Sequence, residues 1–293
     1  MSQHWPTPAA PAAGAPPQEA EPEQVPRSPA PSRAGEDRPW WRRSLSLLIV
    51  VGALALKFGK ALLLLLPKVK VLTTSATMLV SIAAYSLIWG WKFAAGFVLL
   101  LLVHEMGHVI QLRREGIEAS APMFIPFLGA AVMAKSLGDD ATAEARVGLA
   151  GPILGTLGCF LLLPLAWSTG DDFWYALIFT GLFLNLFNLL PVVPLDGGRA
   201  MAALSPWMWF VGLFAMAVLA FTFPNPVIIL ILLLAAFETY RRWKARRSGD
   251  EAVLAYYRVK ASHRFMIFAV YIGLIAVCAV GMGLTFVERD IPR

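Results

Sequence analysis

The feature that most restricts the fold of this chain is a series of apolar runs. Most are close to the roughly 20 residues that an α-helix needs to cross a bilayer. Hydrophobic residues make up 58% of the 293 residues and charged residues only 15%, a composition outside that of ordinary soluble domains. We therefore predict an all-α polytopic membrane protein with seven transmembrane helices. They are expected at 72–90, 93–112, 144–168, 173–190, 206–223, 226–240 and 265–287.

The segment 45–66 is ambiguous, because Lys57 and Lys60 divide its apolar run. It either lies in the membrane interface or forms an eighth spanning helix. Proline and alanine dominate the N-terminal stretch, which has few side chains to bury and is expected to be disordered. The predicted divisions are a cytoplasmic tail (1–43), an interfacial or spanning region (44–71), a membrane-embedded core (72–240), a basic cytoplasmic segment (241–264) and a C-terminal transmembrane helix with its tail (265–293).

The net charge of +6 is explained by membrane topology. Basic residues follow the 93–112 helix and fill the 241–264 segment, which places both on the cytoplasmic side by the positive-inside rule. Asp171 and Asp172 fall on the opposite side. Anionic lipid is a secondary candidate for the basic segment, and nucleic acid is not needed to explain the charge.

Two of the four histidines form an H-E-x-x-H motif, His104 to His108, inside an apolar run that begins at Phe97. On an α-helix, residues four apart share one face, so both histidines can bind one metal ion with Glu105 beside its water. Ionisable side chains at membrane depth each cost on the order of 2.5–3.5 kcal/mol on insertion scales, and a bound metal ion compensates that cost. The alternative is a polar group that only hydrogen-bonds between helices.

A catalytic zinc ion normally takes three ligands from the protein, so the two histidines need a third. Glu115 lies too far along the same helix. Asp196 is the better candidate, because Pro191 and Pro194 cannot continue the 173–190 helix and so present this carboxylate from a break in it. The alternative is that Asp196 only caps the short helix that follows it.

Residues 121–134 are apolar but too short to span, and Pro122, Pro126 and Gly129 interrupt them. A re-entrant or hairpin-like loop fits this pattern. Non-helical backbone at membrane depth needs protein or a water-filled cavity to satisfy it, which would place the loop against the metal site. An interfacial loop that only returns the chain fits the sequence equally well.

The H-E-x-x-H motif and the N-L-L-P-V-V-P-L-D-G string from Asn188 to Gly197 strongly resemble the site-2 protease family of intramembrane zinc metalloproteases. An A-G-P string at 150–152 adds to the resemblance, which covers about residues 93–204. Many members carry Asn where this chain has Gly155, a small residue suited to close helix packing. The chain looks like a minimal form, without a PDZ or CBS domain.

The resemblance implies a role for each motif residue. His104, His108 and Asp196 would bind one zinc ion per chain, and Glu105 would be the general base. Asn188 would help to hold the substrate or the oxyanion. Asn185, on the same helical face as Asn188, is expected instead to hydrogen-bond between helices.

The implied function is that of an intramembrane zinc-dependent endopeptidase, which cuts peptide bonds in or near transmembrane segments of membrane-protein substrates. Two alternatives are a metal-binding membrane protein that transports, senses or scaffolds without hydrolysis, and an inactive member that only grips transmembrane segments. We expect the protein to lie in a lipid bilayer and to have no nucleic acid as a partner. The expected location is a bacterial inner membrane, with the active site toward the cytoplasm.

Overall fold

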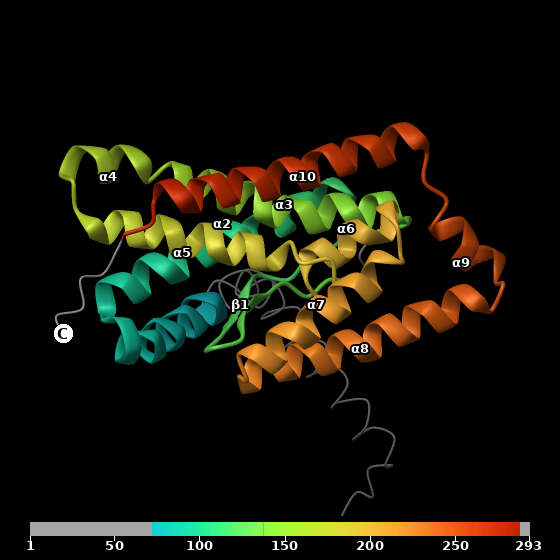
Figure 1. The fold of residues 1–293 in the computed structure, drawn as a ribbon, viewed down its shortest axis with the longest axis horizontal. Helices are drawn as coiled ribbons and strands as arrows, with labels where there is room; N and C mark the ends of the chain where they lie inside the picture. Colours follow the sequence, from blue (N-terminus) through green and yellow to red (C-terminus); the bar gives the residue numbers. More distant parts are fainter. Residues whose placement is uncertain (1–71, 137, 288–293) are drawn as a thin grey trace, which may run out of the picture. The chain divides into compact units, whose positions relative to one another are not determined.

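The computed structural model describes residues 72–136 and 138–287, and this part of the chain is almost entirely helical (Figure 1). Two short strands, β1 (Met123–Ile125) and β2 (Gly129–Ala131), form the one sheet of the described residues. The predictions for the tail 1–43 and for the segment 44–71 fall outside the described residues. The helices are Leu72–Trp89, α2 (Trp91–Arg114), α3 (Ala141–Phe160), α4 (Leu163–Thr169), α5 (Asp172–Asn188), α6 (Asp196–Leu204), α7 (Met208–Thr222), α8 (Pro226–Arg247), α9 (Glu251–Tyr256) and α10 (Ala261–Leu284).

Each of the seven predicted spans is a helix in the structure, although the ends differ. Within the described residues, four helices are long and apolar enough to cross a membrane: Leu72–Trp89, α2, α3 continued by α4 over Ala141–Thr169, and α10. The other three predicted spans are not in this set. The helix α5 has 17 residues, α7 has 15, and α8 ends in a basic run. The class of the fold is therefore confirmed, whereas length and composition support four spans and not the predicted seven.

Side-chain caps set the starts of four helices. Asp140 accepts a hydrogen bond from the Ala143 backbone N–H at 2.7 Å and so begins α3. Asp171, Asn225 and Asp250 cap α5, α8 and α9 in the same way. Each cap satisfies one of the N–H groups that a helix start leaves unpaired.

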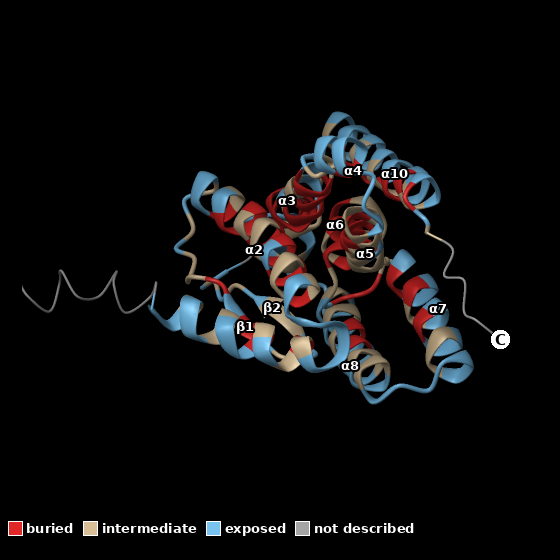
Figure 2. Cartoon of the chain, turned by 90° about the vertical axis from the view of Figure 1, so that its left-hand side faces the viewer, coloured by how far each residue is buried: buried red, intermediate tan, exposed pale blue. Residues whose placement is uncertain are grey.

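The helix α3 is central to the described core, because it packs against α2, α5, α6 and α10. Figure 2 shows buried residues gathered on α2, α3 and α6, with exposed residues on the outer helix faces. A Cβ on Gly107 of α2 would overlap the Ala150 carbonyl group of α3. A Cβ on Gly148 of α3 would lie 2.8 Å from the Asp196 carbonyl oxygen of α6. These glycines let α2 and α6 approach the backbone of α3, which brings their polar side chains together.

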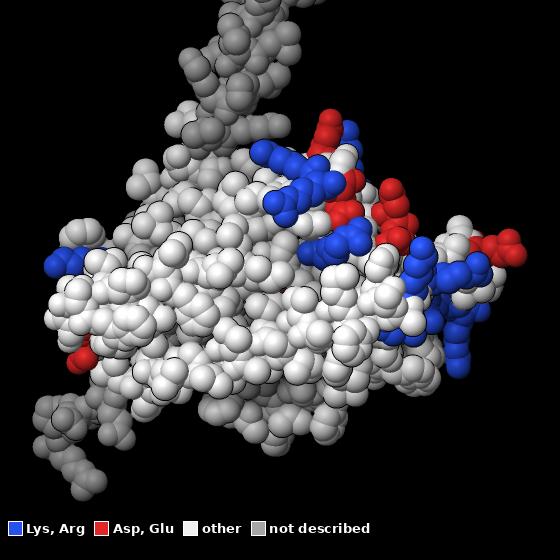
Figure 3. Space-filling model, turned by 90° about the horizontal axis from the view of Figure 1, so that it is seen from above, with Lys and Arg blue, Asp and Glu red and all other residues white. Residues whose placement is uncertain are grey.

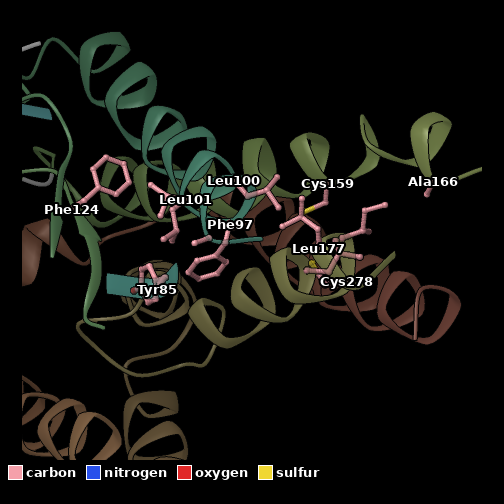
Figure 4. Close-up of a cluster of buried hydrophobic side chains, with 13 residues drawn as sticks. Tyr85, Phe97, Leu100, Leu101, Phe124, Cys159, Ala166, Leu177 and Cys278 are labelled. Atoms are coloured by element: carbon pink, nitrogen blue, oxygen red, sulfur yellow. The ribbon is translucent and has the colours of Figure 1, made fainter. Parts of the chain in front are cut away.

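A buried apolar cluster joins helix Leu72–Trp89, α2, α3, α5 and α10 (Figure 4). The rings of Tyr85 and Phe97 meet edge to face, with centroids 5.3 Å apart. Cys159 and Cys278 are free thiols that pack in this cluster as small apolar side chains. Phe124 of β1 joins the cluster, so the strand is anchored to the helices.

The segment 121–134 folds as an antiparallel β-hairpin, which is the hairpin alternative of the sequence prediction. Helix Leu72–Trp89 supplies hydrogen-bond partners for its backbone. The Phe127 N–H donates to Tyr85 Oη at 3.1 Å, and Thr74 Oγ1 donates to a carbonyl of the same segment at 2.8 Å. Such partners are what non-helical backbone at membrane depth requires.

Much of the outer surface is apolar. On the face that Figure 3 shows, most of the visible Lys, Arg, Asp and Glu side chains lie toward one end, beside a broad uncharged surface. Large apolar side chains such as Leu87, Phe214 and Phe221 are exposed. Extended exposed apolar surface of this kind marks contact with a membrane or a partner.

Candidate metal centre

The helix α2 places both histidines of the H-E-x-x-H motif on one buried face. His104 and His108 are 2% and 5% exposed, and their Nε2 atoms lie 3.2 Å apart. Residues four apart on a helix lie one above the other, so both rings reach the same point. The predicted joint presentation of the two histidines is confirmed.

Asp196 reaches the same point from α6, which lies far along the chain. Its Oδ2 lies 3.0 Å from His104 Nε2 and 3.2 Å from His108 Nε2. Leu195, and not Asp196, is the N-cap residue of α6, and no side chain caps that helix. The carboxylate is therefore directed to the histidines instead of to its own helix, which excludes the capping alternative.

The three ligand atoms suit a tetrahedral zinc ion. Bonds of about 2.0–2.1 Å from zinc to nitrogen or oxygen give a tetrahedron with edges of about 3.3 Å, and the observed separations are 3.0, 3.2 and 3.2 Å. All three residues are buried, and they form the one group of this kind found in the described part of the chain. His104, His108 and Asp196 are positioned to bind a metal ion.

The other ring nitrogen of each histidine is held by a hydrogen bond. His108 Nδ1 lies 2.8 Å from the Val147 carbonyl oxygen of α3. His104 Nδ1 lies 2.7 Å from Asn185 Oδ1 of α5. Partners of this kind orient metal-binding histidines and fix which nitrogen faces the ion.

Two glycines of α3 leave room for this arrangement. A Cβ on Gly151 would overlap His108 Nε2 and would lie 2.8 Å from His104 Nε2. A Cβ on Gly155 would lie 2.5 Å from Asn185 Oδ1. The prediction that Gly155 serves close packing is confirmed, and its neighbour is a polar side chain of the metal centre.

Glu105 is buried beside the ligands, with 7% of its surface exposed. It is near enough to His104, His108 and Asp196 to interact electrostatically with all three. A carboxylate in this position is suited to carry a proton to or from a reacting group.

The structure distinguishes the two asparagines of α5. Asn185 is 2% exposed and makes the interhelical hydrogen bond that the sequence predicted. The sequence does not indicate that the partner is His104, because the rotation of α5 relative to α2 has no signature in it. Asn188 lies partly buried at the end of α5, and no side-chain hydrogen bond among the described residues involves it.

Glu115, which spacing excluded as a ligand, lies just after α2. Its two carboxylate oxygens accept hydrogen bonds from Arg146 of α3, both at 2.8 Å. The Arg146 guanidinium, with help from Gln111, holds the pKa of the Glu115 carboxyl below its usual value. The pair ties α2 to α3 away from the metal centre.

Residues 92–170 and 164–210 match Peptidase family M50. In this part the chain is similar to peptidase family M50. The M50 region contains both helices that supply metal ligands, α2 and α6. It nearly coincides with the stretch that resembles the site-2 protease family in its motifs, and that resemblance is confirmed.

Three relatives of the M50 region carry the name zinc metalloprotease. The chain is 33% identical over 129 residues to zinc metalloprotease MJ0392 of Methanocaldococcus jannaschii, covering 42% of this chain and 37% of that protein. It is 30% identical over 157 residues to putative zinc metalloprotease Rip3 of Mycobacterium tuberculosis, covering 46% and 36%. It is 33% identical over 126 residues to putative zinc metalloprotease YwhC of Bacillus subtilis, covering 38% and 55%.

The matched stretches span between about a third and just over half of the length of these relatives. These relatives are named zinc metalloproteases, and the matched region of this chain holds a buried His-His-Asp group, a set of ligands that suits zinc.

Proposed function

We propose that the chain is an intramembrane zinc-dependent endopeptidase, which hydrolyses peptide bonds in or near transmembrane segments of membrane proteins. The observation that carries this proposal is the position of the metal centre. Two of its three ligands lie on α2, a helix long and apolar enough to cross a membrane. Ionisable residues at such depth are costly and mark functional sites.

The chain's own residues divide the work of hydrolysis. His104, His108 and Asp196 would hold a zinc ion, which would supply Lewis acidity for a peptide carbonyl and for the attacking water near neutral pH. Glu105 accepts a proton from the attacking water at a carboxylate oxygen. It then donates that proton to the amine nitrogen as the C–N bond breaks.

Two further elements are proposed to hold the substrate. Asn188 can offer its side-chain amide to the substrate backbone or to the developing oxyanion. The peptide bonds of a transmembrane helix are hydrogen-bonded within that helix, so the substrate must unwind locally before it can react. The β1–β2 hairpin offers a strand edge that would hold the unwound segment extended.

The proposed membrane placement goes beyond the four candidate spans. It sets α5, α7 and α8 in the bilayer as well, giving seven spanning helices, with the hairpin as a re-entrant element beside the metal centre. The basic last turn of α8 and the arginines that end α2 favour a cytoplasmic position for that side. The proposed location is a bacterial cell membrane, with the active site toward the cytoplasm.

The test compares the wild-type chain with Glu105→Gln and with a control, Glu118→Gln. The control makes the same chemical change at a side chain that is 80% exposed. Each detergent-purified protein is analysed for zinc and is incubated with a panel of single-span membrane peptides, whose products are read by mass spectrometry. Stoichiometric zinc in all three, with cleavage by the wild type and the control only, is the expected result.

Two outcomes would contradict the proposal. Zinc in all three proteins without any cleavage, across a panel that a known M50 protease does cut, would favour metal binding without hydrolysis. Absence of zinc from the wild type would remove the metal centre itself.

A further inference from the structure

The two ligand histidines are held by different kinds of acceptor. His108 Nδ1 donates to the Val147 carbonyl oxygen at 2.8 Å, and a carbonyl oxygen can only accept. This bond keeps the His108 proton on Nδ1 and leaves Nε2 free for a metal. His104 relies on a side chain instead, because its Nδ1 meets Asn185 Oδ1 at 2.7 Å.

Asn185 is held in place for this contact. It is 2% exposed and comes from α5, 81 residues along the chain from His104. Gly155 of α3 lies against its amide: a Cβ there would be 2.5 Å from Oδ1 and 2.9 Å from Nδ2. The amide fits because position 155 carries no side chain.

We propose that Asn185 is a positioning residue of the metal centre. Its Oδ1 keeps the His104 proton on Nδ1 and directs Nε2 to the zinc ion, in a space that Gly155 leaves open. This inference rests on the zinc site of the proposed function.

The expected effect of losing this bond follows from the behaviour of metal-bound histidines. Without the acceptor, a buried Nδ1–H loses its partner and the His104 ring is no longer oriented. Loss of such an outer partner typically weakens metal affinity by about 10–100-fold.

Two substitutions separate positioning from packing. Asn185→Leu keeps the size of the side chain but has no acceptor, whereas Asn185→Asp keeps an acceptor oxygen. Zinc affinity of the full chain in detergent is measured by competition with a chromophoric chelator. Asn185→Leu should weaken zinc binding by about 10–100-fold, and Asn185→Asp should stay close to wild type. If Asn185 had a purely structural role, Asn185→Leu and Asn185→Asp would not differ in zinc affinity in this way.

A change on α3 gives a second route to the same contact. Gly155→Ala should displace the Asn185 amide and weaken zinc binding similarly, and should add little further loss in combination with Asn185→Leu. The control is Gly158→Ala on the same helix, where a Cβ would meet Val103 Cγ1 at 2.9 Å and no polar group. This control should keep the zinc affinity of the wild type.

The cobalt-substituted protein provides a readout beyond affinity. The visible absorption bands of bound Co²⁺ should change in Asn185→Leu and in Gly155→Ala, and should not change in Gly158→Ala. If Asn185→Leu does not fold, Gly155→Ala decides the question.

The outcomes distinguish this inference from the proposed function. Wild-type zinc affinity and an unchanged cobalt spectrum in a folded Asn185→Leu, or in Gly155→Ala, would overturn the role of Asn185 alone. A wild-type chain that binds no zinc would overturn the proposed function instead.

Discussion

An ion pair between a fully buried carboxylate and a partly buried guanidinium ties α3 to α8, and its removal should lower stability by a measurable amount. Glu144 is 0% exposed and accepts hydrogen bonds from Arg242 Nη2 at 2.8 Å and Nη1 at 3.1 Å. The Tyr256 hydroxyl donates to the same carboxylate at 2.7 Å. Arg242 also donates to Glu238 at 2.9 Å. The cluster therefore joins α3, α8 and α9 at the charged end of the described residues.

Glu144→Gln keeps the shape of the side chain but removes the charge that faces Arg242. Breaking a buried ion pair by removing one partner costs about 3–5 kcal/mol of unfolding free energy. Arg242 keeps its bond to Glu238, so the expected loss lies at the lower end, about 3 kcal/mol. At about 2–4 °C per kcal/mol, this corresponds to a decrease in Tm of about 6–12 °C.

The assay is thermal unfolding in detergent for a double-mutant cycle with Arg242→Met. The single Arg242→Met change leaves a fully buried carboxylate without its cation, whereas the double variant lacks both charges. We expect the loss of unfolding free energy in the double variant to be about 2 kcal/mol smaller than the sum of the losses in the two single variants. Additive single effects would refute the reasoning, and Glu118→Gln at the exposed surface should leave Tm unchanged.

The remaining predictions concern the metal centre, the hairpin and the end of α2. Gly151→Ala should abolish zinc binding without loss of helical circular dichroism, because a Cβ would lie on the ligand nitrogens; retained zinc would contradict this. Ala130 pairs with Phe124, whose N–H points away from β2 to a helix side chain. The Ala130 N–H therefore also points away from β1, along the outer edge of β2. Ala130→Pro removes this N–H and should slow cleavage if the substrate pairs with that edge. An unchanged rate would exclude strand addition there. Glu115→Gln should lower Tm near pH 7, because Arg146 depresses the Glu115 pKa in the folded state. That difference in Tm should disappear as the pH falls through the depressed pKa of Glu115, because the carboxyl is then protonated in the folded state. A difference that persists at still lower pH would contradict the assignment.

Local patterns were enough to name the three residues that the structure positions to bind a metal ion. The spacing of His104 and His108 places them on one face of any helix, and the two prolines before Asp196 require a break there. The family resemblance joined these distant strings into one site. No tertiary information was needed to name the three ligands.

The remaining features depend on how helices rotate and pack against one another. The contact between Asn185 and His104 needs the rotation of α5 relative to α2, and the pair of Glu144 and Arg242 joins residues 98 apart in sequence. The count of seven spans stays a proposal, because an apolar run predicts a helix but does not establish that the helix is long enough to cross. Length and composition support four spans among the described helices. The hairpin was only one of the options, since the apolar segment 121–134 carries little strand periodicity.

The central claim is that hydrolysis occurs within the bilayer at this zinc site. The most direct test is to reconstitute the zinc-loaded chain in liposomes with a single-span peptide and to map the cleaved bond by mass spectrometry. We expect a cut inside the spanning segment. This cleavage should be absent with Glu105→Gln and after zinc chelation, and should return when zinc is added back. Cleavage confined to the water-exposed flanks of the peptide, or an equal rate with Glu105→Gln, would contradict it.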